Sequence, residues 1–291
     1  MIVSLVQQLR VRQWTKNTVL FAGVIFAHQF TELSDLLRAA AGFAAFCLLA
    51  SAIYILNDLV DLEVDRVHPK KRNRPLASGR ISRATAWIWG IILVTGGGAL
   101  SIALGIRFAQ VAGGYLLLNI CYTLVLKRVV MVDVLAISIG FVLRAVAGVA
   151  VLREPVDLSP WLLLCTFFLA LFLAVAKRRH ERVLLQDQAE QHRKTLLEYP
   201  PELVDQMIPV VTAATVISYS IYTVSPGTVE SVGGPELVYT VPFVVFGVFR
   251  YLHIVFRRKE GGSPTETLLT DLPILVNVLC WMLVVIWILY G

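Results

Sequence analysis

The sequence predicts an all-α integral membrane protein, and three observations support this fold class. The mean hydropathy is +0.73 and 57% of the 291 residues are apolar, which excludes an ordinary soluble globule. Apolar runs of roughly 17–22 residues, the length needed to cross a ~30 Å hydrocarbon layer, recur along the chain. These runs lack the alternation of apolar and polar residues found in transmembrane barrels, so we expect helices.

Nine such runs are predicted to be transmembrane helices. The first is short, and only Gly105, Ile106 and Arg107 separate the third run from the fourth. No flexible linker interrupts the series, so residues 1–291 are expected to form a single membrane domain. Residues 1–17 lack the features of a cleavable signal peptide and are expected to form an amphipathic helix at the interface. The runs lie at about 17–30, 38–56, 84–104, 107–126, 131–152, 159–176, 207–225, 236–256 and 268–290.

The 26 Lys and Arg residues are distributed unevenly between alternate connections. If the N-terminus is cytoplasmic, the outer connections contain only Arg38, Arg107 and Arg153 of this set. The positive-inside rule therefore predicts a cytoplasmic N-terminus and an external C-terminus. This topology also accounts for the net charge of +6 without a nucleic-acid partner. The two long charged connections, about 57–83 and 177–206, both lie inside, where we expect the chemistry.

A dense polar segment follows the second run. One helix face carries an amide and three carboxylates within about 100° when residues are placed ~100° apart; the set is Asn57, Asp58, Asp61 and Asp65. Such a set suits Mg²⁺, which keeps several waters and completes its shell with substrate phosphates. A basic run follows that could hold more phosphate charge, namely Lys70, Lys71, Arg72 and Arg74. A polar loop after a capped helix end is the alternative interpretation.

Asp133 and Arg144 are ionisable residues of the fifth run. They are separated by about 20° on the helix face and by ~16 Å in depth. Charge is costly in hydrocarbon, so such residues are functional candidates. Gly140 and Gly148 share the face and leave room for a cavity or a close helix neighbour. We expect a groove in which Arg144 contacts an anion; bonds from Arg144 to carbonyls of a neighbouring helix are the structural alternative.

Polar residues at the ends of other runs are weaker candidates. Lys127, near Asp133, is either a phosphate ligand or an ordinary helix-end cation. Lys16 and Asn17 open the first run, where they either meet an anion or anchor the helix at the interface.

The second inner loop is strongly basic. Lys177 and Glu181 are one helical turn apart, as in a common ion pair. The segment 177–194 is either a solvated helix or an anion clamp facing the Asp-rich loop.

These features favour a membrane transferase that acts on a pyrophosphate ester, with the apolar bundle holding a lipid tail. A transporter is the alternative from another class. The charges cluster at one surface, however, and no pair of Gly- or Pro-broken helices occurs at mid-depth.

The motif NDLVDLEVD at 57–65, followed by RPLASG at 74–79, resembles the signature of the UbiA superfamily of intramembrane prenyltransferases. NICYTLVLK at 119–127, with Asp133, is similar to the fourth and fifth helices of that family. The resemblance covers nearly the whole chain. It implies nine helices around a central cavity, with a cytoplasmic cap formed by the loops between helices 2 and 3 and between helices 6 and 7.

The second cap loop departs from the pattern of aromatic prenyltransferases, because KRRHE at 177–181 replaces a second DxxxD. That loop resembles the decaprenyl-phosphate phosphoribosyltransferase branch of the superfamily, as do RQWTKN, FVLRAVAG, HRKTLLEY and YSIYT. This resemblance implies Mg²⁺-dependent transfer of 5-phosphoribose from phosphoribosyl pyrophosphate to a polyprenyl phosphate in a bacterial cytoplasmic membrane. Transfer of a prenyl chain from its diphosphate to an aromatic or other small acceptor is the alternative. The oligomeric state is left open, and a homo-oligomer is compatible with the sequence.

The resemblance also implies roles for individual residues. Mg²⁺ and pyrophosphate would be held by Asn57, Asp58, Asp61 and Asp65. Phosphates would be bound by Lys70, Arg74, Lys177 and Arg178. The lipid phosphate or sugar phosphate would meet Lys16, Lys127 and Arg144. The expected substrate site is completed by Asn17, Tyr122, Asp133 and Glu181, and the expected catalytic set is Asp58, Asp61, Asp65 and Arg144. A lipid phosphate is already anionic at pH 7, so no general base is expected.

Overall fold

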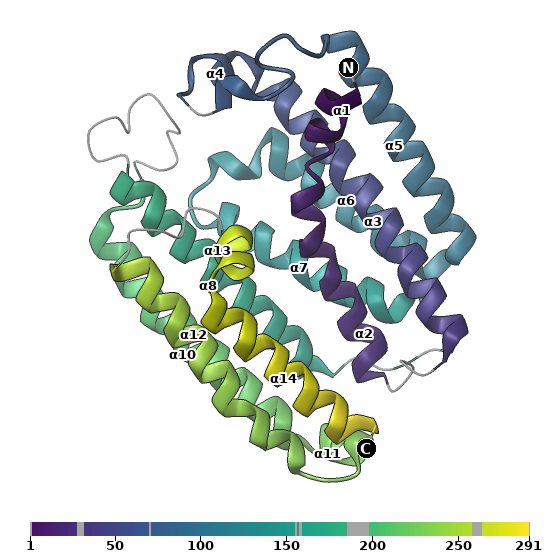
Figure 1. The fold of residues 1–291 in the computed structure, drawn as a ribbon, viewed down its shortest axis with the longest axis vertical. Coiled ribbons are helices and arrows are strands. Elements are labelled where there is room, and N and C mark those ends of the chain that lie inside the picture. Colours follow the sequence, from purple (N-terminus) through teal and green to yellow (C-terminus); the bar gives the residue numbers. More distant parts are fainter. Residues whose placement is uncertain are drawn as a thin grey trace. The chain divides into compact units, whose positions relative to one another are not determined.

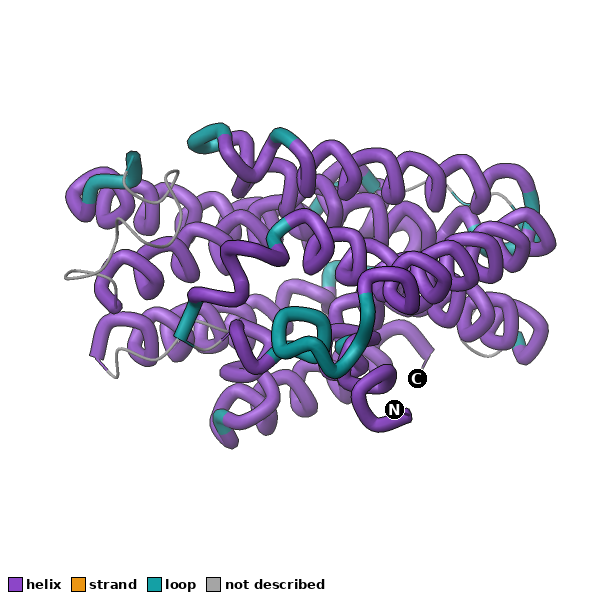
Figure 2. Tube along the Cα trace, turned by 90° about the horizontal axis from the view of Figure 1, so that it is seen from above, coloured by secondary structure: helices purple, strands orange, loops and turns teal. Residues whose placement is uncertain are grey.

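The protein is described by a computed structural model that covers residues 2–27, 32–69, 71–154, 156, 159–184, 198–257 and 264–290. Throughout these residues the chain forms helices and loops and contains no strand (Figure 2). The predicted all-α class is therefore confirmed. Within this part of the chain, seven helices are long and apolar enough to cross a membrane, judged by length and composition. Nine runs were expected.

Two of the predicted runs account for the difference. The first begins at the end of a 3-10 helix, η1 (Val11–Val19), and continues as the short helix α2 (Leu20–Phe26). The amphipathic segment before it forms α1 (Ile2–Leu9) and ends at Arg10, whose φ of 53° lies in the left-handed region. The run at 107–126 forms α6 (Ile106–Leu124), which is long enough but is diluted by polar side chains.

The chain divides into two compact units. Unit 1 comprises the residues up to Ala136 together with Leu143–Val156, and unit 2 comprises Ile137–Val142 and most of the chain from Asp157 onward. Besides α1, η1, α2 and α6, unit 1 contains α3 (Leu33–Val60), α4 (Leu62–Val67), η2 (Lys71–Asn73), α5 (Arg83–Leu104), η3 (Leu126–Arg128) and both ends of α7 (Val132–Ala150).

Helix α3 is the centre of unit 1. Its most apolar stretch is 61% buried, compared with 22% for that of α5. Figure 1 shows α1, η1, α2, α5 and α6 beside it, and each of them contacts it. Trp87, Ile88 and Ile91 of α5 are exposed. Because α5 keeps apolar side chains on its outer face, that face suits contact with lipid tails.

Helices α2 and α7 approach each other through glycine. A Cβ atom at Gly148 would lie 2.0 Å from the carbonyl oxygen of Leu20, and one at Gly23 would lie 2.5 Å from the carbonyl carbon of Gly148. No larger residue fits at Gly148 unless a backbone moves. The sequence allowed either a cavity or a close helix neighbour on this face of α7, and at Gly148 the close neighbour is present.

Unit 2 is a second helical bundle, in which α10 packs against α8 and α12, and α12 packs against α14. Tyr219, Thr240 and Trp281 join three of its elements: the Tyr219 and Thr240 hydroxyls are 2.6 Å apart, and Trp281 Nε1 donates to the Tyr219 hydroxyl at 2.9 Å. Its helices are α8 (Pro160–Leu184), α10 (Pro201–Val224), α11 (Pro226–Val232), η5 (Glu236–Thr240), α12 (Val241–Arg257), α13 (Pro264–Thr270) and α14 (Leu272–Tyr290).

The last predicted run, 268–290, is interrupted at Asp271, between α13 and α14. Asp271 Oδ1 accepts a hydrogen bond from the backbone N–H of Ile274 at 3.2 Å, and Oδ2 accepts from Arg250 Nη2 at 2.8 Å. Asp271 is thus a helix-start carboxylate with a cationic partner.

Candidate active site

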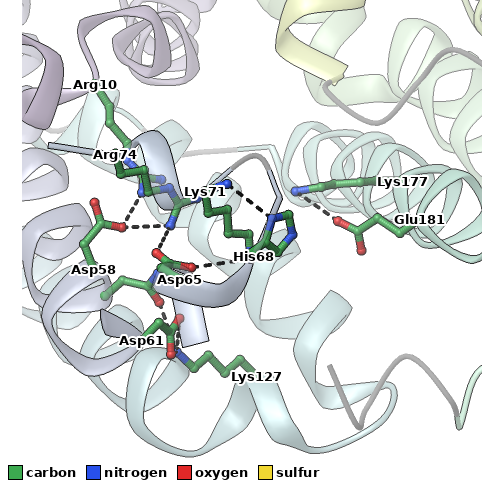
Figure 3. Close-up of polar contacts among 11 residues, drawn as sticks. Arg10, Asp58, Asp61, Asp65, His68, Lys71, Arg74, Lys127, Lys177 and Glu181 are labelled. Atoms are coloured by element: carbon green, nitrogen blue, oxygen red, sulfur yellow. Dashed lines mark hydrogen bonds and ion pairs between the residues drawn. The ribbon is translucent and has the colours of Figure 1, made fainter. Parts of the chain in front are cut away.

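Two acidic side chains from consecutive helices share one arginine. Asp58 lies in the last turn of α3, Asp65 lies in α4, and Arg74 follows η2. Arg74 Nη1 donates to Asp58 Oδ1 at 3.0 Å and also to Asp65 Oδ2 (Figure 3). The two carboxylates are only 3% and 2% exposed, whereas Arg74 is 26% exposed. Since two buried carboxylates repel each other, the guanidinium between them stabilises their proximity.

The loop that carries Arg74 is held in place by apolar contacts. Leu76 and Ile81 are 2% and 5% exposed and belong to one buried cluster with Ile55 of α3 and Leu62 of α4. The backbone N–H of Ile81 donates to the carbonyl of Pro75 at 3.1 Å, which closes the turn. The motif RPLASG therefore folds back onto the helix that ends in the acidic motif.

A second group forms around Lys127, which lies in η3. Its Nζ donates to both oxygens of Asp61, at 2.6 and 2.7 Å, and to Asn57 Oδ1 at 3.2 Å. Lys127 is 8% exposed at its side chain, while Asp61 is 31% exposed. The predicted polar set is therefore divided: Asp58 and Asp65 share Arg74, while Asn57 and Asp61 share Lys127.

The N-terminal segment contributes two residues that the sequence analysis did not place in the site. Gln8 Nε2 donates to Asp58 Oδ2 at 2.7 Å, and Arg10 forms an ion pair with Asp58 Oδ1. The Arg10 guanidinium also lies 5.0 Å from the centroid of the Tyr54 ring. Burial lowers the pKa of Arg10, and the Asp58 carboxylate acts in the opposite direction. Gln8 and Asp58 are 50 positions apart, so no local spacing could reveal the contact.

A third group surrounds Arg144 within the helices. Its Nε donates to Asn17 Oδ1 and its Nη2 to the Tyr115 hydroxyl, both at 2.8 Å. The guanidinium lies 4.7 Å from the Tyr115 ring centroid, and Asn17 Nδ2 donates to Cys47 Sγ at 3.3 Å. These three partners are side chains of other helical segments. Arg144 and Asn17 are 6% and 0% exposed, so this group is deeply buried.

The remaining predicted residues are placed as follows. Asp133 is 1% exposed, and Lys16 and Tyr122 are half-buried. Glu63, which belongs to the same motif, is 68% exposed and pairs with Arg66. In unit 2, Glu181 forms an ion pair with Arg178, and Lys177 Nζ lies 3.6 Å from Glu181 Oε1. Lys70 lies outside the described residues, as does much of the second cap loop.

The carboxylates of this site supply only part of the oxygen ligands that a hard cation such as Mg²⁺ requires. Among the described residues, no three His, Cys, Asp or Glu side chains gather closely enough to hold a metal ion. Mg²⁺, however, is commonly bound by one or two carboxylates together with substrate phosphates and water. Asp65 Oδ1 is a buried carboxylate oxygen that receives no hydrogen bond, and Lys71 Nζ is 3.9 Å away from it. These carboxylates therefore suit a metal ion whose coordination is completed by substrate phosphates and water.

Comparison with known proteins defines the class of this protein. Residues 18–268 match the UbiA prenyltransferase family. The chain therefore belongs to that family and is a multi-pass membrane transferase, as the acidic motif indicated.

Two relatives of known name and one solved structure are similar to nearly the whole chain. The chain is 32% identical to the decaprenyl-phosphate phosphoribosyltransferase of Corynebacterium glutamicum, over 99% of this chain and 87% of that protein. It is 28% identical to the protein of the same name from Mycolicibacterium smegmatis, over 97% and 91%. A solved UbiA homologue from Archaeoglobus fulgidus, bound to GPP and Mg²⁺, superposes with a TM-score of 0.75 at 20% identity, covering 99% of this chain and 100% of that one. This last likeness shows the fold.

Proposed function

We propose that this protein transfers 5-phosphoribose from phosphoribosyl pyrophosphate to a polyprenyl phosphate of the decaprenyl type and releases pyrophosphate. The observation that carries the proposal is the match of nearly the whole chain to two decaprenyl-phosphate phosphoribosyltransferases. Helices with apolar outer faces suit a lipid acceptor, and the paired acidic and basic groups suit a donor that carries several phosphates.

The reaction needs no protein nucleophile. An anionic oxygen of the lipid phosphate attacks the anomeric carbon, the bond from that carbon to the pyrophosphate oxygen breaks, and the electron pair leaves with pyrophosphate. The configuration at the anomeric carbon is inverted. Because the attacking oxygen is already deprotonated at pH 7, no general base is required.

The Asp-rich group would bind the pyrophosphate end of the donor. Asp61 and Asp65 are the proposed metal ligands, with Asn57 and Asp58 acting directly or through water. Mg²⁺, when bound, would neutralise the pyrophosphate and make it a better leaving group. Arg74 and Lys127 contact these carboxylates and can also donate to phosphate oxygens, so they would hold the charge of the leaving group.

The other cations would bind the remaining phosphates. Arg144 is the proposed contact for the lipid phosphate or sugar phosphate, since its buried guanidinium is oriented by hydrogen bonds to Asn17 and to the Tyr115 hydroxyl. The other proposed substrate contacts are Lys16, Asn17, Lys70, Tyr122, Asp133, Lys177, Arg178 and Glu181.

The finer architecture is part of the same proposal. Nine helices would surround a central cavity within one domain, and the loops at about 57–83 and 177–206 would form a cap. The distribution of Lys and Arg supports a cytoplasmic N-terminus and active site in a bacterial inner membrane.

The test is a membrane assay that follows label from phosphoribosyl pyrophosphate into an organic-phase product. We expect label only when Mg²⁺ and a polyprenyl phosphate are both present. Asp61→Asn should reduce turnover by at least ~100-fold, because the remaining amide binds the metal poorly. Glu63→Gln, which changes an exposed carboxylate two positions away, is the matched control and should keep wild-type turnover. Turnover of a prenyl diphosphate with an aromatic acceptor, without transfer of phosphoribose, would reject the proposal.

A further inference from the structure

Gln8 has a buried amide of which only one end is satisfied. The residue is 2% exposed, and its Nε2 donates to Asp58 Oδ2 at 2.7 Å. Its Oε1 is buried and receives no hydrogen bond. A buried acceptor without a donor is destabilising, because it has lost its hydrogen bonds to water. Such an acceptor beside the acidic motif is therefore a candidate contact for a ligand that can donate.

The orientation of this amide follows from its partner. Asp58 is held by the guanidinium groups of Arg10 and Arg74 and accepts hydrogen bonds, so the NH₂ group of Gln8 faces it. Exchanging the two ends of the amide would place two acceptors against each other. Oε1 is thus held as an acceptor, because Nε2 is committed to Asp58.

The backbone around Gln8 is also fixed against α3. The carbonyl oxygen of Leu9 accepts a hydrogen bond from Ser51 Oγ at 3.0 Å, and Trp14 Nε1 donates to the same Ser51 hydroxyl at 3.0 Å. Arg10 reaches the carboxylate that Gln8 contacts. The N-terminal segment thus holds Gln8 and Arg10 on Asp58 as a unit, which orients the free acceptor in advance.

We infer that Gln8 determines specificity for the sugar of the donor, by accepting a hydrogen bond at Oε1 from a ring hydroxyl. The inference rests on the proposed function. Phosphate and pyrophosphate oxygens are acceptors at neutral pH and cannot satisfy Oε1. Among the groups of the two proposed substrates, only the ribose hydroxyls can donate to it. The same residue keeps Asp58 in place through Nε2, which couples recognition of the sugar to the acidic motif.

The test compares phosphoribosyl pyrophosphate with its 2-deoxy and 3-deoxy analogues. For the wild type, kcat/KM with one of the two deoxy analogues should be at least ~10-fold lower than with phosphoribosyl pyrophosphate. The missing hydroxyl would leave the buried acceptor unsatisfied. Gln8→Met keeps the size of the side chain and removes the acceptor, so this preference should fall below ~3-fold. Gln7→Met, at an exposed neighbour that accepts from Arg80, is the control and should keep the full preference.

A second variant separates recognition of the sugar from support of Asp58. Gln8→Lys retains a donor toward Asp58 but has no acceptor, so it should also lose the preference. If a variant has no measurable turnover, binding replaces kinetics. The increase in Tm caused by phosphoribosyl pyrophosphate is then compared with the increase caused by its deoxy analogue. An undiminished preference in both Gln8 variants would overturn the inference. Absence of phosphoribose transfer by the wild type would instead reject the proposed function.

Discussion

At the scale of single residues, the candidate site is built from cations that contact acidic or polar side chains of other helical segments. Arg74 contacts two buried carboxylates, Lys127 contacts Asp61, and Arg144 contacts Asn17. A buried charge without a partner would be strongly destabilising in this apolar environment. The pairing allows several charges to persist in a protein that is otherwise mostly apolar.

Arg144 provides a test at this scale. We expect Arg144→Gln to raise the KM for polyprenyl phosphate or for phosphoribosyl pyrophosphate by at least ~10-fold, because a hydrogen bond from a charged group contributes about 1.5–3 kcal/mol. Steady-state kinetics in which each substrate is varied in turn would measure both KM values. Arg128→Gln, which changes an exposed cation in η3, is the control and should leave KM unchanged. A folded Arg144→Gln protein with wild-type KM and kcat would show that Arg144 has only a structural role.

At the scale of the helices, close packing positions the segments that carry the site. Helix α2 follows directly after η1, which contains Asn17, and α2 meets α7, which contains Arg144. The contact of Gly148 with the Leu20 carbonyl brings the two backbones together and therefore supports the hydrogen bond between Arg144 and Asn17.

Gly148→Val should separate α2 from α7. The added side chain would overlap the backbone at Leu20, so we expect a loss of stability of about 2 kcal/mol or more, together with reduced turnover. Thermal unfolding in detergent would measure the change in Tm. The control is Gly113→Ala in α6, where a Cβ atom has no neighbour within 4 Å and the Tm should stay unchanged or rise slightly. Equal Tm values for wild type and Gly148→Val would contradict the packing argument.

At the scale of the whole molecule, the distribution of cations predicts the topology. Reporter fusions can test it, because alkaline phosphatase is active only outside the cytoplasm and green fluorescent protein fluoresces efficiently only inside it. A fusion after Arg80 should fluoresce and lack phosphatase activity, whereas a fusion after Tyr290 should show the reverse. Fusions after Glu154, in a predicted outer loop, serve as a further control. Fluorescence of the fusion after Tyr290 would contradict the predicted topology or the predicted number of spans.

Much of the fold could be predicted because hydropathy acts locally along the chain. A segment that must satisfy its own backbone in lipid has to be helical, so the apolar runs gave the all-α class and most helix positions. The first run and 107–126 are not among the helices that are long and apolar enough to cross a membrane. The first run begins in a 3-10 helix and continues as the short helix α2, and the polar side chains of α6 lower the hydropathy of the second segment.

By itself, the sequence determined the family and the acidic motif, since both are contained in short runs of residues such as NDLVDLEVD. Only the tertiary structure decided which cation meets which carboxylate. Lys127 is 66 positions from Asp61, and Arg144 is 127 positions from Asn17, so these contacts depend on which helices pack together. The same holds for Gln8 and Asp58, whose contact forms because the N-terminal segment lies along α3. Spacing within one helix predicts a shared face, but it contains no information about the side chains that another helix brings to that face.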